Sequence, residues 1–341
     1  MNRADAHRKF LNDHGWGKAG VTALPSDASF RQYHRLQDGA RRALLMEAPP
    51  DKENIHAYVI IARHLVALGL SAPKILALDE AAGLAVIEDF GEDTYTRLLD
   101  GGADPVALYE LAVDVLIALH GCDDAASVDA PAYDHNRLLD EAALLVDWYL
   151  PAMTGASTPD AVRQSWLDAW QTVFEGASSL ASTLVLRDYH VDNLMVLKER
   201  SGAARAGLLD FQDAVIGHPA YDLVSLLEDA RRDVSDALTQ AMQDRYRAAL
   251  PSLADETLGP WYAILGVQRH AKIAGIFVRL CVRDGKPIYM PHIPRVMGLL
   301  ARRLDAPELA PVKAWFDEHL PHVTQSLPPL DPAVVRRLVS V

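Results

Sequence analysis

The sequence predicts an α+β fold in two parts, a β-rich N-terminal lobe over residues 1–91 and a mainly helical C-terminal lobe over residues 92–341. Short runs rich in β-branched and aromatic residues, bounded by turn residues, dominate the first lobe. Apolar residues at spacings of three and four dominate the second lobe. Half of the residues are hydrophobic, which is enough for one large or two modest cores. We expect a ligand to bind in the cleft between the two lobes.

The N-terminal lobe begins with a short helix, followed by five predicted strands over residues 21–25, 30–36, 42–47, 74–78 and 84–90. Asp38-Gly39 is a hairpin signal between the second and third strands. A helical pattern over residues 53–68 separates the third and fourth strands, and Gly69 follows it in the position of a C-terminal cap. Gly91 to Asp93 is the predicted join to the second lobe.

The C-terminal lobe begins with helical patterns, in which Leu108, Leu111, Val115 and Leu119 share one face. Short strands return only at residues 184–186, 194–197 and 207–209. From Tyr221 to the end the pattern is helical, with proline-rich breaks. We therefore expect a helical body that carries a small inserted β-hairpin.

Composition excludes several classes of protein. The net charge of −13 opposes binding to nucleic acid, although a bound Mg²⁺ would let the chain hold a small phosphate ligand. No apolar run reaches the roughly 18 residues of a membrane span, and the N-terminus lacks the apolar region of a secretory signal. Two distant cysteines, Cys122 and Cys281, make neither a disulfide framework nor a zinc site. We expect a cytoplasmic monomer with no membrane partner.

The chemistry is concentrated in the stretch from Leu184 to Leu197, followed by Asp210-Phe211. Asp188 and Asn193 flank a polar loop between two short strands, and Asp210 follows a third. Phosphoryl transfer needs a carboxylate that accepts the proton of the attacking hydroxyl, and oxygen ligands that hold Mg²⁺. This spacing is the arrangement of the catalytic loop and metal-binding aspartate in protein kinases, although Leu186-Arg187 replaces the usual His-Arg lead-in. We predict Asp188 as the catalytic base and Asn193 and Asp210 as the metal ligands.

The same segment resembles the corresponding motif of the aminoglycoside phosphotransferase and choline kinase superfamily, which has the protein-kinase-like fold. Gly217-His-Pro-Ala-Tyr-Asp-Leu223 is similar to another element of that superfamily. The resemblance implies a two-lobe kinase that uses ATP and Mg²⁺, with 1–91 as the nucleotide-binding lobe and 92–341 as the catalytic and acceptor-binding lobe. It also implies that Asp222 orients the catalytic loop through backbone hydrogen bonds.

Further strings resemble those of bacterial anomeric kinases for N-acetylmuramate and N-acetylglucosamine. They are Ala28 to Arg35, Met46 to Pro50, Asp210 to Ala214 and Gln268 to Lys272. The resemblance implies an amino-sugar substrate, a sugar 1-phosphate product and a role in cell-wall recycling. Two alternatives remain: the same fold acting on an aminoglycoside, a choline-like amine or a homoserine-type alcohol, and a non-catalytic binding module.

The N-terminal lobe departs from the kinase pattern at two points. Its nucleotide-covering loop, Ser26 to Arg31, contains no glycine, so Ser29, Phe30 and Arg31 are the predicted nucleotide-binding residues, unless the loop is an ordinary hairpin turn. The third strand has Met46 where a phosphate-binding lysine is expected. Either Arg31, Arg35 or Lys52 supplies the positive charge instead, or phosphate binding relies more heavily on Mg²⁺. The backbone near Glu88 to Phe90 is the predicted adenine hinge.

The residues around the catalytic loop are the candidates for the acceptor pocket, namely Arg187, His190, Asp192 and Gln212. A zinc site built from the histidine and the neighbouring aspartates is a weaker alternative, since no further ligand has suitable spacing. Arg269 and Lys272 lie on one stripe of a later helix and are predicted to meet an acceptor anion such as the lactyl carboxylate of N-acetylmuramate. The alternative for that stripe is ion pairing with acidic helices nearby.

Overall fold

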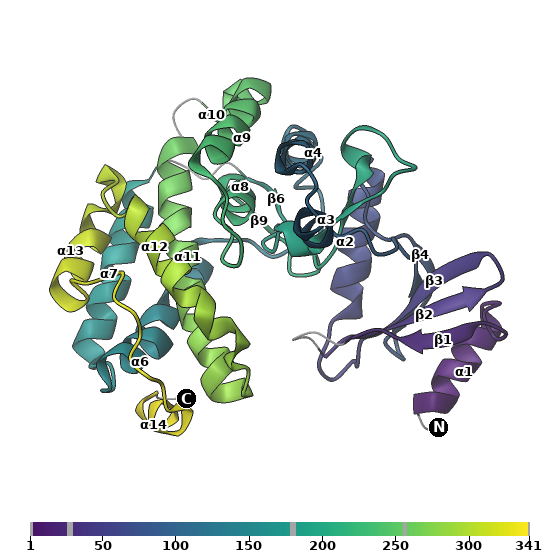
Figure 1. The fold of residues 1–341 in the computed structure, drawn as a ribbon, viewed down its shortest axis with the longest axis horizontal. Coiled ribbons are helices and arrows are strands. Elements are labelled where there is room, and N and C mark those ends of the chain that lie inside the picture. The colour runs from purple at the N-terminus through teal and green to yellow at the C-terminus, as the bar shows by residue number, and fades with distance from the viewer. Residues whose placement is uncertain (1–2, 26–29, 178–181, 255–257, 340–341) are drawn as a thin grey trace. The chain divides into compact units, whose positions relative to one another are not determined.

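The computed structural model describes residues 3–25, 30–177, 182–254 and 258–339. These residues form two compact units, one of residues 1–131 and 186–215 and the other of residues 132–185 and 216–341 (Figure 1). The units do not coincide with the predicted lobes, and the lobe boundary near residue 91 stays a prediction. Each unit is described by itself below.

The N-terminal part of the first unit forms a five-stranded antiparallel sheet, in the order β1-β2-β3-β5-β4. The strands are β1 (Gly20–Ala23), β2 (Gln32–Asp38), β3 (Arg41–Glu47), β4 (Ile75–Asp79) and β5 (Leu84–Ile87). All five strands expected from the sequence are present, although the last ends at Ile87 rather than at residue 90. The apolar, β-branched runs therefore predicted both the number of strands and their order along the chain.

Glycines make the two tight turns of this sheet. Gly39 has φ +60° in the turn between β2 and β3, as the Asp-Gly signal predicts. Gly83 has φ +65° between β4 and β5, and a Cβ added there would lie 2.0 Å from the carbonyl oxygen of Ala48. A side chain at Gly83 would thus be both conformationally strained and sterically blocked.

Two helices cover the sheet region of the first unit. Helix α1 (Arg3–Asp13) lies beside the sheet (Figure 1). Its Phe10 and Leu11 pack into a core with Leu36 and Val86 of the sheet. Helix α2 (Ile55–Ala67) begins where the Asn54 side chain accepts a hydrogen bond from the N–H of residue 57, at 3.2 Å. It ends just before Gly69, which adopts φ +80°, so the expected C-terminal cap is in place.

The rest of the first unit carries the catalytic segment. Helices α3 (Tyr95–Asp100) and α4 (Pro105–His120) lie beside the hairpin of β7 (Leu194–Val196) and β8 (Ala206–Leu208). A link to Ser71, between α2 and β4, fixes this hairpin. The carbonyl of Ser71 accepts from the N–H of Leu208 at 2.7 Å, and its hydroxyl donates to the carbonyl of Ala204 at 2.6 Å. The hairpin is therefore held by the segment that leads into the sheet.

The second unit is mainly helical, as expected (Figure 1). Its helices are α5 (His135–Leu144), α6 (Leu150–Thr154), α7 (Asp160–Gly176), α8 (Ala220–Leu227), α9 (Asp236–Ala249), α10 (Pro251–Ala254), α11 (Leu258–Asp284), α12 (Ile293–Arg303), α13 (Ala310–His319) and α14 (Pro332–Leu338). A π-helical turn, Leu145–Tyr149, joins α5 to α6. Helix α11 packs against α5, α8 and α12 and is buried along most of its length.

A two-stranded sheet pairs β6 (Thr183–Val185) with β9 (Val215–Gly217). The sequence predicts β6 but not β9. None of the helices in the described part of the chain combines the length and apolarity that a membrane span requires.

Candidate active site

The predicted catalytic loop follows β6 and leads into β7. Asp188 is exposed at its tip, and its N–H donates to the carbonyl of Leu186 at 2.8 Å. Asn193 closes the loop, because its side-chain amide donates to the carbonyl of Asp188 at 2.9 Å. The hydroxyl of Tyr189 donates to the carbonyl of Ala112 in α4 at 2.7 Å, which anchors the loop to the unit. The five-residue spacing of Asp188 and Asn193 thus allows the last residue of the loop to hydrogen-bond to the backbone of Asp188 and close the loop.

Two residues of the site have left-handed backbone conformations without being glycine. Arg187 has φ 67° and Asp210 has φ 56°. Such a conformation costs about 1 kcal/mol or more for a residue with a side chain, and it persists only where the surroundings enforce it. The two strained residues are the one before the predicted base and one of the predicted metal ligands, so the strain coincides with the candidate chemistry.

Asp210 stands at the end of the segment that follows β8, where its carboxylate is about half exposed. Its Oδ1 accepts from Nη2 of Arg31 at 3.1 Å and from the amide of Gln212 at 3.0 Å. The same arginine donates through Nη1 to Oε1 of Gln212. The backbone also links Asp210 to the catalytic loop, because the N–H of Leu209 donates to the carbonyl of Asn193 at 2.9 Å.

The oxygens of Asn193 and Asp210 fit a hard divalent cation. The amide nitrogen of Asn193 is used by Asp188, which leaves its Oδ1 as an acceptor, and Oδ2 of Asp210 has no hydrogen bond among the described residues. No group of three or more His, Cys, Asp or Glu side chains in the described part of the chain could hold a metal by itself. Two oxygens without such a group fit Mg²⁺, which is commonly completed by phosphates and water. The zinc alternative relies on His190 with Asp188 and Asp192, and these three side chains are not such a group.

The predicted acceptor residues near the loop have partners within the first unit. Asp192 accepts a hydrogen bond from the hydroxyl of Thr96 in α3. His190 is buried, and its Nδ1 lies 3.8 Å from Oδ2 of Asp192. Arg187 donates to the carbonyl of Asp213 at 3.3 Å. The structure brings these residues together around the loop, and their contact with an acceptor stays a prediction.

The predicted nucleotide-covering loop is described only from Phe30 onward, and Ser29 lies outside the described residues. The Phe30 side chain is 59% exposed, and the ammonium of Lys52 lies 4.6 Å from the centre of its ring. Arg31 is 8% exposed and points to Asp210. Of the two loop residues that the structure describes, Arg31 therefore contacts the catalytic segment, through Asp210.

The predicted adenine hinge follows β5 and is fixed by side chains. The carboxylate of Glu88 accepts from Arg200, and its backbone N–H donates to the carbonyl of Lys74 at 2.9 Å. The Phe90 ring lies under the Arg200 guanidinium at 5.2 Å and against Gly207, where a Cβ would come within 2.7 Å of it. These contacts hold the segment in place, and its binding of adenine stays a prediction.

Comparisons with known proteins point in one direction. Residues 20–255 match the phosphotransferase enzyme family. The N-acetylmuramate/N-acetylglucosamine kinase of Caulobacter vibrioides is 39% identical, over 95% of this chain and 98% of the relative. The enzyme of the same name from Pseudomonas aeruginosa is 36% identical, over 88% and 90%.

The chain belongs to the phosphotransferase enzyme family. Solved structures agree on the fold. Choline kinase LicA from Streptococcus pneumoniae superimposes with a TM-score of 0.63 at 12% identity, over 88% of this chain and 99% of that one. Aminoglycoside phosphotransferase APH(4)-Ia, solved with AMP-PNP and hygromycin B, gives a TM-score of 0.57 at 14% identity, over 88% and 99%. The predicted two-lobe, protein-kinase-like fold and the predicted superfamily are thereby confirmed.

The second unit of the phosphotransferase holds the remaining predicted site residues. Asp222 is fully buried in α8, close enough to Tyr246 for its charge to add to burial in raising the pKa of that tyrosine. Lys272 in α11 pairs with Glu141 at 2.9 Å, so the ion-pairing alternative describes this residue, with α5 as its partner. The bracing role of Asp222 and the substrate role of Lys272 stay predictions.

Arg269 is 5% exposed in α11 and donates through Nη2 to the hydroxyl of Ser225 at 2.8 Å. Its Nε and Nη1 have no hydrogen-bond partner among the described residues. A buried guanidinium with two such nitrogens is costly unless a further group approaches it. That cost is consistent with the predicted anion contact of Arg269, which stays a prediction.

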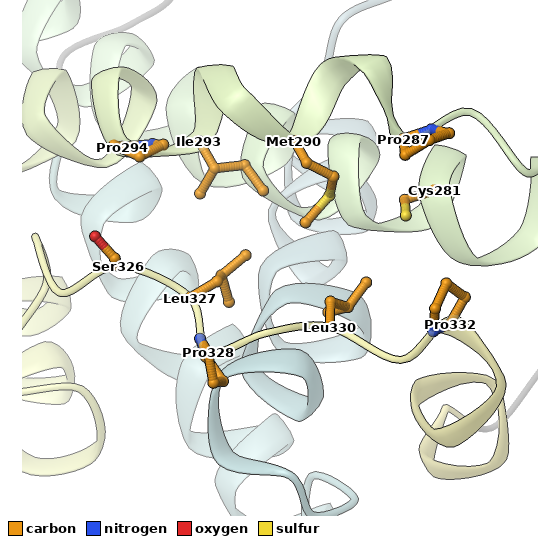
Figure 2. A pocket seen from close by; sticks show the side chains of 10 residues that line it. All are labelled: Cys281, Pro287, Met290, Ile293, Pro294, Ser326, Leu327, Pro328, Leu330 and Pro332. Carbon is orange, nitrogen blue, oxygen red and sulfur yellow. The ribbon is translucent and has the colours of Figure 1, made fainter.

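The phosphotransferase also has a hollow of about 380 Å³ in the second unit, between the end of α11 and the C-terminal segment. Figure 2 shows Met290 and Cys281 on one side and Leu327 and Leu330 on the other, all pointing into it. Its lining is almost entirely apolar and contains no Asp, Glu, Lys, Arg or His, so it does not suit a charged nucleotide.

Sequence reasoning missed two residues of the site. Glu53 contacts Arg31, with 3.5 Å between Oε2 and Nε. An acidic residue at the start of the helix after the third strand was a usable signal, because protein kinases take the glutamate that pairs with their phosphate-binding lysine from that helix. Thr96, which donates to Asp192, carries no sequence signal, since nothing in a threonine on a short helix indicates a tertiary partner 96 residues away.

Proposed function

We propose that this phosphotransferase transfers the γ-phosphoryl group of ATP, with Mg²⁺, to the anomeric hydroxyl of N-acetylmuramate and N-acetylglucosamine. The product is the sugar 1-phosphate, and the role is in the recycling of cell-wall sugars. The observation that carries the proposal is the presence of Asp188, Asn193 and Asp210 on one bridged loop and hairpin, in a chain 34–39% identical to four kinases of that name.

The proposed reaction assigns one role to each of these residues. Asp188 accepts the proton of the anomeric hydroxyl as its oxygen attacks the γ-phosphorus and the bond to the bridging oxygen of ADP breaks. Asn193 and Asp210 would hold Mg²⁺, which neutralises negative charge on the phosphates. Asn193 also fixes the carbonyl of Asp188 at 2.9 Å, so one residue positions the base and binds the metal.

The proposal also gives roles to seven further residues, namely Asp222, Arg187, His190, Asp192, Gln212, Arg269 and Lys272. Asp222 braces the loop, and the others line the acceptor site. The phosphotransferase acts as a monomer in the cytoplasm. Nucleotide contacts come from Ser29, Phe30 and Arg31 and from the backbone between Glu88 and Phe90.

An acceptor panel tests this proposal. ATP consumption with Mg²⁺ is measured for N-acetylmuramate, N-acetylglucosamine, kanamycin, choline and homoserine, and the phosphorylated position of each product is determined by NMR. We expect turnover of the two amino sugars with phosphate on the anomeric oxygen. Turnover of kanamycin, choline or homoserine alone would assign the same fold to another acceptor. Absence of Mg²⁺-dependent nucleotide binding would favour the non-catalytic module.

A further inference from the structure

A buried arginine takes a central place in the first unit. Arg31 directly precedes β2, and each nitrogen of its fork faces a different acceptor. Nη2 lies 3.1 Å from Oδ1 of Asp210, Nη1 donates to Gln212, and Nε lies 3.5 Å from Oε2 of Glu53. A guanidinium stays protonated at every ordinary pH, so burial does not remove its charge. The chain thus keeps a permanent positive charge beside its predicted metal ligand.

Glu53 holds both the loop and the arginine with one carboxylate. Its Oε1 accepts from the backbone N–H of Phe30 at 3.1 Å, and its Oε2 faces Arg31. The residue lies between β3 and α2, just before Asn54, which caps the helix, and its side chain is 17% exposed. The start of α2 therefore determines where the guanidinium points.

The other basic residues considered for the phosphate site have partners other than Asp210. Arg35 pairs with the buried carboxylate of Asp89 at 2.9 Å and with Glu92 at 2.9 Å. Lys52 lies over the Phe30 ring. Position 46, where kinases have the lysine, is a methionine with no exposed surface. Among the described residues considered, Arg31 is the cation in contact with Asp210.

We propose that Arg31 binds the phosphates of the nucleotide and that Glu53 is the positioning residue that holds Arg31 for this task. Protein kinases use a lysine on the third strand, paired with a glutamate of the following helix. Here the cation comes from the start of the second strand and the glutamate from the turn before α2. A guanidinium fork suits phosphate oxygens and can exchange its bond to Asp210 for them. The inference rests on the proposed function, because it assumes a nucleotide substrate.

Calorimetric titration with ADP and Mg²⁺, and separately with adenosine, tests the inference on the full chain. Glu53→Gln keeps the size of the side chain but removes its charge. It should weaken ADP binding by about tenfold and leave adenosine binding within about twofold. Arg31→Gln should weaken ADP binding by about tenfold to a hundredfold. Glu80→Gln, at an exposed glutamate paired with His56, is the matched control and should change neither.

The double variant separates positioning from a merely structural role. If Glu53 acts through Arg31, the variant with both glutamines should bind ADP no more weakly than Arg31→Gln alone. Unchanged ADP affinity in Glu53→Gln, additive losses in the double variant, or an equal loss of adenosine binding would overturn the inference while the proposed function stands. A wild-type chain that binds no ADP would overturn both.

Discussion

Replacing Gly275 with alanine should destabilise the second unit, because the glycine lies where α11 meets the end of α5. A Cβ added at Gly275 would sit 2.1 Å from the carbonyl oxygen and 2.3 Å from the carbonyl carbon of Leu144. Real Cβ atoms essentially never come within 3.0 Å of such an atom, so the two segments must separate by roughly 1 Å. The obstructing atoms are backbone and cannot rotate away. The cost should therefore reach about 3 kcal/mol, the upper end of the range for overpacking.

Gly298 in α12 provides a matched control for the same chemical change. A Cβ built there meets nothing within 4 Å, and the residue is helical. Gly298→Ala should stabilise the chain by about 0.5–1 kcal/mol, because alanine is the better helix former. The two substitutions thus have opposite expected signs, although the sequence change is identical.

Thermal unfolding followed by circular dichroism measures both effects. At about 2 °C per kcal/mol, Gly275→Ala should lower Tm by about 6 °C and Gly298→Ala should raise it by about 1–2 °C. Shifts of the same sign and similar size would refute the reasoning, because close approach of α11 to Leu144 would then not be what distinguishes Gly275.

Two further predictions concern acid sensitivity and the metal. Burial lowers the pKa of His218 to about 3 and that of His270 to about 4. Because only the unfolded chain protonates these histidines between pH 6.5 and 5, each should lower the free energy of unfolding by about 2 kcal/mol by pH 5. Tm measured from pH 7 to pH 5 should therefore fall. A Tm that does not change over this range would contradict the lowered pKa values of the two histidines. Asn193→Ala should raise the Mg²⁺ concentration for half-maximal activity by about tenfold or more, since loss of a residue that only supports a metal ligand already weakens metal binding by that factor. An unchanged Mg²⁺ titration would show that Asn193 is not a metal ligand.

Much of the fold followed from local patterns. The strands of the first unit were predictable because β-branched runs alternate with turn residues such as Gly39 and Gly83, whose positive φ the structure requires. The spacing of Asp188, Asn193 and Asp210 was equally readable, because a short loop joins the first two and only the β7–β8 hairpin separates them from the third. The short strand β9 was not readable, since Val215–Gly217 pairs only through a distant segment.

The binding of the nucleotide phosphates could not be predicted to the same depth. Arg31, Arg35 and Lys52 are all basic residues of the N-terminal lobe, so the sequence alone does not show which of them lies near the phosphates. Their tertiary contacts distinguish them. Arg31 reaches Asp210 across 179 positions of the chain, whereas Arg35 is taken up by Asp89. No local propensity encodes such contacts, because they depend on how the β7–β8 hairpin and the sheet pack in three dimensions.

The most direct test of the account compares the wild-type chain with Asp188→Asn in two measurements on the same samples. Transfer of phosphate from ATP to N-acetylmuramate should fall by at least about a hundredfold, the contribution expected of a general base. The affinity for ADP with Mg²⁺ should stay within about twofold, because Asn193 and Asp210 remain. Full turnover by Asp188→Asn would contradict the assignment of Asp188 as the catalytic base.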